Sequence, residues 1–399
     1  MAACASSVPQ QPATTSGRKP YPHGAEPIGT VRDVYNGVLT PEMAVNTFRN
    51  IDRLFPTRTV PRASTPFLLP RDTDPFPTVS FSDRGGRYDL GDYLELNRVA
   101  GLLVLKNGRI KLERYRFGNS DHTRWMSMSI AKSITSTLIG AAVKQGHIHS
   151  LSEPVTRYVP SLAGSAYEKV SVRDVLMMSS GVRWNETYTD PASDRRRLLE
   201  AQISQAPGSA LAVMRSLSRE AEPGTVHNYN TGETQVAAEI LRGAVGQTLA
   251  SYLSERIWRK FGMEADASWW LDSLDGTEIG GSGFSATLRD YGRFGLFFLN
   301  GGVAAGEAIL PADWTREATT PKVLHSGKPQ AYGYLWWTGD TEASQRDGAF
   351  MAMGIHGQFL YINPIANVVI VVWSAQPHPT EGAVIDDWLF CDAVTAALR

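Results

Sequence analysis

Cysteine is nearly absent from this chain of 399 residues, which contains only Cys4 and Cys391. Two cysteines at opposite ends of a sequence make no Cys-x-x-Cys motif, no cluster of metal ligands and no disulfide framework. The pattern therefore argues against zinc and redox chemistry. We expect a protein that works without a metal ion and without a cofactor.

An excess of charge and long apolar runs are also lacking. The 39 basic and 40 acidic residues give a formal net charge of −1, so nothing in the composition points to nucleic acid or an anionic membrane surface as a partner. No stretch reaches the roughly 20 apolar residues that a transmembrane helix requires. With 42% hydrophobic and 20% charged residues, the chain has the composition of a globular protein with a large core, in one large domain or two.

The N-terminus has no apolar segment of the kind that a secretory signal needs. Residues 1–20 are rich in serine, proline, threonine and glutamine, which predicts a disordered tail and, as the sequence stands, a cytoplasmic protein. An alternative stays open, because Ala2-Ala3-Cys4 followed by a polar tether is also typical of the cleavage end of a bacterial lipoprotein signal. In that case an upstream segment is missing, and the protein would be periplasmic and anchored through a lipid on Cys4.

A serine and a lysine stand three residues apart at the start of a long apolar pattern. Apolar residues recur at helical spacing after Ser129, and Gly146 supplies a stop, so a buried helix is predicted over residues 129–145. Positions i and i+3 share one face of a helix, which would place the amine of Lys132 beside the hydroxyl of Ser129. This is the arrangement of a nucleophile with an adjacent general base. The alternative is a helix N-cap serine and a lysine that reaches toward the surface.

Strand patterns stand toward both ends of the chain. Residues 99–115 contain Asn107-Gly108, which predicts a hairpin with a two-residue turn, and residues 357–364 and 368–373 predict a second hairpin. A closing helix is expected over residues 381–398. Because strands at both ends enclose a helical middle, we predict an α/β (α+β) fold in which one antiparallel sheet is assembled from both chain ends and flanked by helices.

The domain organisation that we expect follows from these patterns. A proline-rich and aromatic segment is predicted to lie as an extended strap over a domain, apart from one helix from Thr40 to Leu54. The expected units are the tail 1–20, the strap 21–95, an α/β domain made of 96–150 and 281–399, and a mostly helical inserted domain 151–280. Within the last of these, residues 171–178 predict a short capped helix, and the turn at 222–232 leads into another helix.

The order of these motifs resembles a known family. Ser-x-x-Lys after a hairpin is followed by Asp-Val-Leu-Met-Met-Ser-Ser-Gly at 174–181, by Pro-Gly-Thr at 223–225 with Tyr229 five residues after the glycine, and by a C-terminal hairpin that runs from a glycine to Pro364. This combination resembles the serine β-lactamase-like hydrolases, which include class C β-lactamases, D-alanyl carboxypeptidases and related esterases. The resemblance covers roughly residues 95–399 and implies the β-lactamase/transpeptidase-like fold.

Three strings resemble one group within that family, the 6-aminohexanoate-dimer (nylon oligomer) hydrolases. They are residues 184–193, 336–339 and 354–358. The resemblance implies that Tyr188 faces the substrate amide and that Trp337 forms a wall of the same cleft. Considered without the strings, both side chains would be assigned to the core.

The resemblance also implies a role for each residue of the catalytic motifs. Ser129 would be the acylated nucleophile and Lys132 its base, and Tyr229 would relay the proton. The backbone N–H groups of Ser129 and Ile355 would form the oxyanion hole.

Two positions depart from the family's pattern. The asparagine expected two residues after the tyrosine is Thr231, with Asn230 beside it. The usual Lys-Thr-Gly or His-Thr-Gly of the edge strand reads Ala352-Met353-Gly354, and the loss of that cation argues against tight recognition of a β-lactam or peptide carboxylate.

Three polar residues near these motifs are assigned to structure rather than chemistry. His356 lies between two glycines and no Gly-x-Ser-x-Gly elbow exists, so we expect no Ser-His-Asp triad. Asp174 is expected to be a surface charge, and Glu186 is expected to anchor a loop.

These observations predict a serine hydrolase that cleaves small linear amides or carboxylic esters through an acyl-enzyme on Ser129. Small-molecule substrates are the expected partners, and a homodimer is left open. A promiscuous carboxylesterase is the main alternative. A β-lactamase or D-alanyl carboxypeptidase and a non-catalytic ligand receptor are the others.

Overall fold

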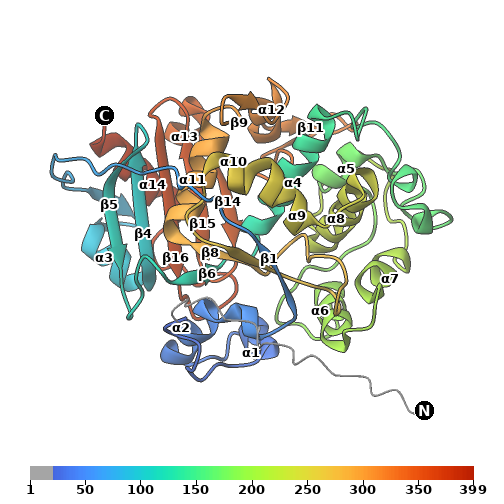
Figure 1. Ribbon diagram of the computed structural model, residues 1–399, viewed down its shortest axis with the longest axis horizontal. Coiled ribbons are helices and arrows are strands. Elements are labelled where there is room, and N and C mark those ends of the chain that lie inside the picture. The colour runs from blue at the N-terminus through green and yellow to red at the C-terminus, as the bar shows by residue number, and fades with distance from the viewer. Residues whose placement is uncertain (1–20) are drawn as a thin grey trace, which may run out of the picture.

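The computed structural model of the protein describes residues 21–399, shown in Figure 1. The tail expected over residues 1–20, including Cys4, lies outside the described residues. Among residues 21–399, no helix is long and apolar enough to cross a membrane.

A six-stranded antiparallel sheet forms the centre of the molecule, with the strand order β13-β14-β15-β16-β4-β5. Its strands are β4 (Val99–Lys106), β5 (Arg109–Tyr115), β13 (Trp337–Thr338), β14 (Phe350–Gly354), β15 (Gln358–Asn363) and β16 (Val368–Ser374). Strand β16 pairs with β4 over most of its length, so the predicted sheet built from both chain ends is confirmed. Asn107 and Gly108 both have positive φ, of 50° and 73°, as a tight hairpin turn between β4 and β5 requires.

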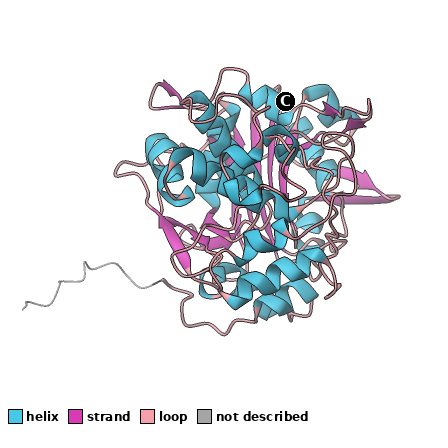
Figure 2. Ribbon diagram, turned by 90° about the vertical axis from the view of Figure 1, so that its right-hand side faces the viewer, coloured by secondary structure: helices cyan, strands magenta, loops and turns pink. Residues whose placement is uncertain are grey.

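The two faces of this sheet are both covered, and Figure 2 shows the strands enclosed by helices. Successive side chains of a strand point to opposite faces. Leu103 and Leu105 of β4 join the core on the side of helix α11 (Leu288–Leu299), whereas Leu102 and Val104 join a second core with helices α3 (Leu90–Leu96) and α14 (Asp387–Ala397). This double burial explains the nearly continuous apolar runs of β4 and β16.

Helix α4 (Ile130–Lys144) is buried on all sides, because all thirteen residues from Ile130 to Ala142 are buried. It packs against α8 (Thr231–Val245) and α9 (Leu249–Leu253) and against strands β14 and β15 of the large sheet. The prediction of a buried helix over 129–145 is confirmed. A helix enclosed in this way holds its first turn rigidly.

The region between α4 and α11 consists largely of helices joined by loops. Its other helices are α5 (Val172–Leu176), α6 (Asp194–Ser204), α7 (Ser209–Arg215) and α10 (Arg259–Phe261), with short 3₁₀ turns at Val155–Arg157 and Pro160–Leu162 and a π turn at Ser254–Trp258. Asp174 is 5% exposed and forms a capping box with Ser171 at the start of α5. The expectation that Asp174 is a surface charge is therefore wrong, and the Ser-x-x-Asp spacing was the signal for the cap.

A second, four-stranded sheet with the order β1-β7-β8-β6 was not expected from the sequence. Its strands are β1 (Thr57–Val60), β6 (Arg124–Met126), β7 (Ala267–Trp270) and β8 (Phe284–Thr287). Each strand has three or four residues, which is too short for a clear alternating pattern. Strand β1 belongs to the segment expected as a strap, so this segment takes part in a sheet.

The described part of the N-terminal segment also carries helices α1 and α2, a small hairpin, and most of helix α3. Helix α1 (Val31–Asn36) begins with a capping box between Thr30 and Asp33. Helix α2 (Pro41–Arg49) starts at the predicted Thr40 cap but ends before Leu54, which follows a 3₁₀ turn at Ile51–Arg53. The remaining short elements are β2 (Ser80–Asp83), β3 (Gly86–Asp89), β9 (Val303–Ala304), β10 (Glu307–Ala308), α12 (Trp314–Thr319), β11 (Lys322–Val323), β12 (Pro329–Gln330) and α13 (Glu342–Asp347).

Helix α14 starts later than the closing helix predicted over 381–398. Glu381 has a φ of 56°, which is outside the helical range. The side chain of Asp386 accepts a hydrogen bond from the backbone N–H of Leu389 and caps the helix there. Residues 377–385 therefore form a loop.

Candidate active site

Ser129 occupies the N-cap position of helix α4, but its side chain makes no capping hydrogen bond. The hydroxyl oxygen lies instead 2.8 Å from the amine nitrogen of Lys132, which donates to it. Met128, the residue before Ser129, has a φ of 40°, so the chain turns sharply into the helix. Ser129 keeps 8% of its surface exposed, and its hydroxyl is free of a structural task.

Lys132 is buried, and its surroundings favour an uncharged amine. The nitrogen lies 3.0 Å from the carbonyl oxygen of Gly281 and 5.4 Å from the ring centre of Tyr229. Burial lowers the pKa of Lys132 to about 7, Glu186 raises it and Arg195 lowers it further. A lysine tuned to this range can accept a proton near neutral pH.

Tyr229 lies in the loop that leads into helix α8, next to the side chains of Ser129 and Lys132. Its ring stacks on Trp337 with the ring centres 5.4 Å apart. Burial and then the charge of Glu186 raise the pKa of Tyr229, whereas contact with the Ser129 hydroxyl lowers it. The phenol is therefore protonated at neutral pH and able to give and recover a proton.

The end of strand β14 touches the backbone at Ser129. A Cβ atom on Gly354 would come within 2.6 Å of the carbonyl oxygen of Ser127 and 2.9 Å of the backbone nitrogen of Ser129, so only glycine permits this approach. Ile355 follows directly. Within residues 21–399, the backbone N–H groups of Ser129 and Ile355 donate to no acceptor, and both are available to a substrate oxygen.

A cleft of about 600 Å³ opens onto Ser129. Tyr188, Tyr229, Trp337 and Ile355 line it, so the structure brings together all the residues that the sequence singled out around the nucleophile. Lys132 does not line the cleft itself, but its amine donates a hydrogen bond to the hydroxyl of Ser129, which does. Among residues 21–399, the cleft is also lined by five acidic residues and by no lysine, arginine or histidine; the acidic residues are Glu186, Asp340, Glu381, Asp386 and Asp387.

The fixed position of Glu186 supports the expectation that this residue anchors a loop. Its carboxylate accepts hydrogen bonds from the backbone N–H and the hydroxyl of Thr231 and from the indole of Trp184. Thr231, which stands where the family has asparagine, thus holds the loop of Tyr188 beside helix α8. The anchor also brings a negative charge close to Lys132.

His356 has the structural role that was predicted for it. The side chain is 2% exposed, and its two ring nitrogens lie 2.8 Å from the carbonyl oxygen of Gln376 and 3.0 Å from that of Val34. Burial lowers its pKa to about 4. The imidazole ties the end of β14 to helix α1 and makes no contact with Ser129.

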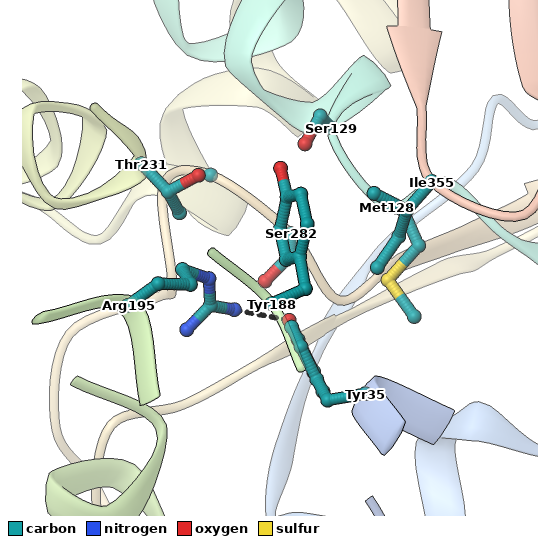
Figure 3. Close-up of a pocket in the computed structure, with 9 residues that line it drawn as sticks. Tyr35, Met128, Ser129, Tyr188, Arg195, Thr231, Ser282 and Ile355 are labelled. Atoms are coloured by element: carbon teal, nitrogen blue, oxygen red, sulfur yellow. Dashed lines mark hydrogen bonds between the residues drawn. The ribbon is translucent and has the colours of Figure 1, made fainter. Parts of the chain in front are cut away.

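A second small pocket beside Ser129 is lined by Tyr35, Arg195 and Ser282, none of which was predicted from the sequence (Figure 3). Tyr35 comes from helix α1 and Arg195 from the first turn of α6, and Arg195 points toward the hydroxyl of Tyr35, to which it donates a hydrogen bond. The Gly-Gly-Ser-Gly string at 280–283 was the only available signal, since such a run often marks a close backbone approach. Within residues 21–399, no group of three or more His, Cys, Asp or Glu side chains is arranged to hold a metal ion.

Comparison with known proteins shows the family. Residues 96–392 match the Beta-lactamase family. The 6-aminohexanoate-dimer hydrolase of Paenarthrobacter ureafaciens is 33% identical over 305 residues, which are 73% of this chain and 76% of that protein.

Solved structures agree with this result. A putative 6-aminohexanoate-dimer hydrolase from Bacillus anthracis superimposes with a TM-score of 0.76 at 26% identity, covering 88% of this chain and 91% of the other. A family VIII carboxylesterase shares the fold alone, with a TM-score of 0.58 at 18% identity over 75% and 92% of the two chains. The chain therefore belongs to the β-lactamase family and is a serine hydrolase of that fold.

Proposed function

We propose that this protein hydrolyses small linear amides or carboxylic esters through a covalent acyl-enzyme on Ser129. The observation that carries the proposal is the 2.8 Å contact between the Ser129 hydroxyl and a buried lysine amine with a pKa lowered to about 7. A nucleophile needs an adjacent base that is uncharged at the working pH. The contact between Ser129 and Lys132 meets both conditions.

Acylation begins with transfer of the Ser129 hydroxyl proton to Lys132. In its uncharged form the amine donates to the carbonyl oxygen of Gly281 and uses its lone pair to accept the hydroxyl proton. The serine oxygen attacks the substrate carbonyl carbon, and the carbonyl π electrons move onto its oxygen. The N–H groups of Ser129 and Ile355 stabilise this oxyanion without reorganisation, because β14 and α4 already hold them in place.

The leaving group departs after it receives a proton. Tyr229 adjoins both Lys132 and the cleft, and we assign it the relay: its phenol gives a proton to the leaving nitrogen or oxygen and recovers one from the lysine ammonium. Water then attacks the acyl-enzyme, loses its proton by the same relay and releases the acid, which restores Ser129.

The cleft supports a small, linear substrate. Its aromatic and aliphatic walls, Tyr188, Tyr229, Trp337 and Ile355, suit an alkyl chain. The relative from Paenarthrobacter ureafaciens is named for the dimer of 6-aminohexanoate, and we include amides of such amino acids among the proposed substrates. Carboxylic esters are proposed equally, since ester cleavage needs less help for the leaving group.

The lining of the cleft disfavours the β-lactamase and D-alanyl carboxypeptidase alternative. Those substrates carry a carboxylate on the carbon next to the scissile amide nitrogen, close to the nucleophile, whereas a 6-aminohexanoate amide carries it five carbons away. Among residues 21–399, the lining of the cleft offers five acidic side chains and no basic one to such a carboxylate. Met353 occupies the position before Gly354 on the edge strand, so no cation is supplied there either. A chromogenic cephalosporin is expected to remain intact in the presence of the purified protein.

A fluorophosphonate probe tests the proposal. We expect rapid labelling of a single serine, identified as Ser129 by peptide mass spectrometry, together with turnover of a panel of p-nitrophenyl esters and short amino-acid amides. A protein that binds these compounds but neither reacts with the probe nor turns them over would be a ligand receptor. Labelling at a different serine would refute the assignment of Ser129.

A further inference from the structure

Arg195 is a buried cation without an acidic partner. The residue is 3% exposed, and no carboxylate within residues 21–399 lies at ion-pair distance from it. Its guanidinium donates to the hydroxyl of Tyr35 and lies 4.4 Å above the centre of the Tyr35 ring. Its Nε atom is buried with no hydrogen-bond partner. A buried charge without a partner destabilises the folded state. The presence of such a charge beside the nucleophile therefore suggests a functional role.

The unpaired guanidinium lines the pocket that borders the nucleophile. Arg195 shares this pocket with Ser129, Tyr188 and Ser282 (Figure 3). The hydroxyl of Ser282 is likewise buried without a partner. Because water is excluded on this side, the charge of Arg195 is screened little by solvent and acts on its neighbours.

Arg195 and Glu186 bring opposite charges to the surroundings of the Lys132 amine. Arg195 shares its pocket with Ser129 and Gly281, the two hydrogen-bond partners of that amine, and Glu186 lines the cleft at Ser129. The positive charge lowers the pKa of Lys132 and the negative charge raises it. Glu186 comes from the loop before α6, where Thr231 and Trp184 hold its carboxylate. The tyrosines around the amine, Tyr229 and Tyr188, have raised pKa values because of burial and stay neutral.

The elements packed against α4 add no other charge at this point. Glu233 of α8 is buried, accepts a hydrogen bond from Ser180, and has a pKa raised by burial, so it is neutral. Tyr252 of α9 bonds to Gln145 at the far end of α4, and Tyr361 of β15 belongs to the core on the other face of the sheet. Arg195 and Glu186 therefore form an opposed pair around Lys132.

We propose that Arg195 is a positioning residue of the reaction, whose fixed positive charge opposes that of Glu186 and keeps the amine of Lys132 uncharged and ready to accept the Ser129 proton. The inference deepens the proposed function and rests on it. Tyr35 holds the guanidinium of Arg195 in the pocket, because its hydroxyl accepts a hydrogen bond from Arg195 and its ring lies under the charge. Helix α1, which carries Tyr35, lies outside the residues 96–392 that match the family, so a segment N-terminal to the matched residues contributes to this active site.

The sign of the effect is opposite for the two charges. Removal of the positive charge in Arg195→Met would make protonation of Lys132 easier, raise its pKa and move the acid limb of kcat/KM to higher pH. Removal of the negative charge in Glu186→Gln would lower the pKa of Lys132 and move the limb to lower pH. For unit charges in a largely buried site, we expect shifts of roughly one pH unit each.

The experiment measures the pH dependence of kcat/KM for a p-nitrophenyl ester in the wild type, Arg195→Met and Glu186→Gln, with Arg195→Lys as the conservative variant. Arg195→Lys keeps the positive charge, so the acid limb of its kcat/KM profile is expected to lie close to that of the wild type. Arg196→Met is the matched control: Arg196 is the next residue, is 5% exposed and binds Asn36 and the carbonyl of Tyr188, but is not among the charges that act on Lys132. Arg196→Met is expected to lower the free energy of unfolding without shifting the acid limb of the kcat/KM profile along the pH axis.

A second measurement separates this inference from the proposed function. The ¹³Cε shift of Lys132, in protein labelled with ¹³C-lysine and assigned by its absence in Lys132→Arg, reports the pKa of the amine without any turnover. If the wild type hydrolyses nothing and does not react with the fluorophosphonate probe, the proposed function fails while the shift titration still tests the charge pair. Equal loss of activity at every pH in Arg195→Met, together with an unmoved ¹³C titration, would overturn the role of Arg195.

Discussion

The amine nitrogen of Lys132 lies 2.8 Å from the hydroxyl oxygen of Ser129. Both residues belong to the first turn of α4, where a spacing of three residues places side chains on one face. The contact is therefore set by the helix itself, and the burial of that helix prevents it from shifting.

Replacing Ser129 with alanine should lower kcat by roughly 10³-fold or more, because the atom that forms the acyl-enzyme is removed. The fold should survive. Since the Ser129 side chain makes no capping hydrogen bond, the free energy of unfolding should fall by less than about 1 kcal/mol. Steady-state kinetics and thermal unfolding of the same preparation check both parts, and retention of more than a few per cent of the activity would mean that another residue is acylated.

The activity should depend on the protonation of Lys132. A base must be uncharged, so kcat/KM should rise with pH and reach half of its maximum near the lowered pKa of about 7. Lys132→Arg should be nearly inactive at every pH, because a guanidinium does not give up its proton. A profile that is flat from about pH 5 to 9 would exclude lysine from this role, since a tuned catalytic lysine titrates within that range.

Tyr188 should matter more for amides than for esters. An amine leaves the tetrahedral intermediate only when it is protonated or hydrogen-bonded, whereas a phenoxide leaves unaided. Tyr188 lines both the cleft and the pocket beside Ser129. We expect Tyr188→Phe to lower kcat/KM for a short amide by roughly tenfold, about 1.4 kcal/mol of transition-state stabilisation, with a much smaller change for a p-nitrophenyl ester. Equal losses on both substrates would show that Tyr188 only shapes the cleft.

Gly354→Ala should impair catalysis through the backbone. The new methyl group would meet the carbonyl oxygen of Ser127 at 2.6 Å and the nitrogen of Ser129 at 2.9 Å, so β14 has to move and the N–H of Ile355 moves with it. A misplaced oxyanion donor typically costs about 10²-fold in kcat. Gly24→Ala is the control, because its methyl group would meet only an ordinary contact at 3.4 Å. Comparable kinetics for the two variants would argue against an oxyanion hole at Ile355.

The acidic lining of the cleft should select substrates by charge. Asp340 and Glu381 are exposed on the cleft and have no cationic partner within residues 21–399. We expect a p-nitrophenyl ester with a terminal ammonium group to react at least several-fold faster than one with a terminal carboxylate, with a difference that shrinks as salt is added.

The double variant Asp340→Asn/Glu381→Gln should reduce this preference. Glu168→Gln, which removes a surface charge that does not line the cleft, should leave it unchanged. An equal preference for the ammonium ester in the wild type and in the double variant would mean that Asp340 and Glu381 do not select substrates by charge.

Much of the site could be predicted because its signals are local. Ser129 and Lys132 lie one helical turn apart, and Asn107-Gly108 specifies its hairpin without help from the rest of the chain. Tyr229 and Ile355 could be placed only through the resemblance of their surrounding strings to a family. Nothing in the loop that carries Tyr229, or in the turn after β14 that carries Ile355, encodes their distance from Ser129.

Arg195 could not be predicted for a physical reason. It stands in the run Asp194-Arg195-Arg196-Arg197, and a run of charges on a helix usually indicates a face in contact with water. Tertiary packing buries two of these arginines instead, against α1 and the loop of Tyr188. Tyr35 was missed for the same reason, since only the folded chain brings α1 to the nucleophile.

The pairing of β4 with β16 has a consequence for how the protein becomes active during its synthesis. Strand β4 is made early, but its neighbour β16 lies near the C-terminus, and contacts between residues so distant in sequence form late and slowly. Until then β4 has an unpaired edge, which favours association with other nascent chains. The same delay applies to Ile355, so a partly synthesised chain carries its nucleophile without one of the two oxyanion donors and is expected to be catalytically silent until β14 has been made and has joined the sheet.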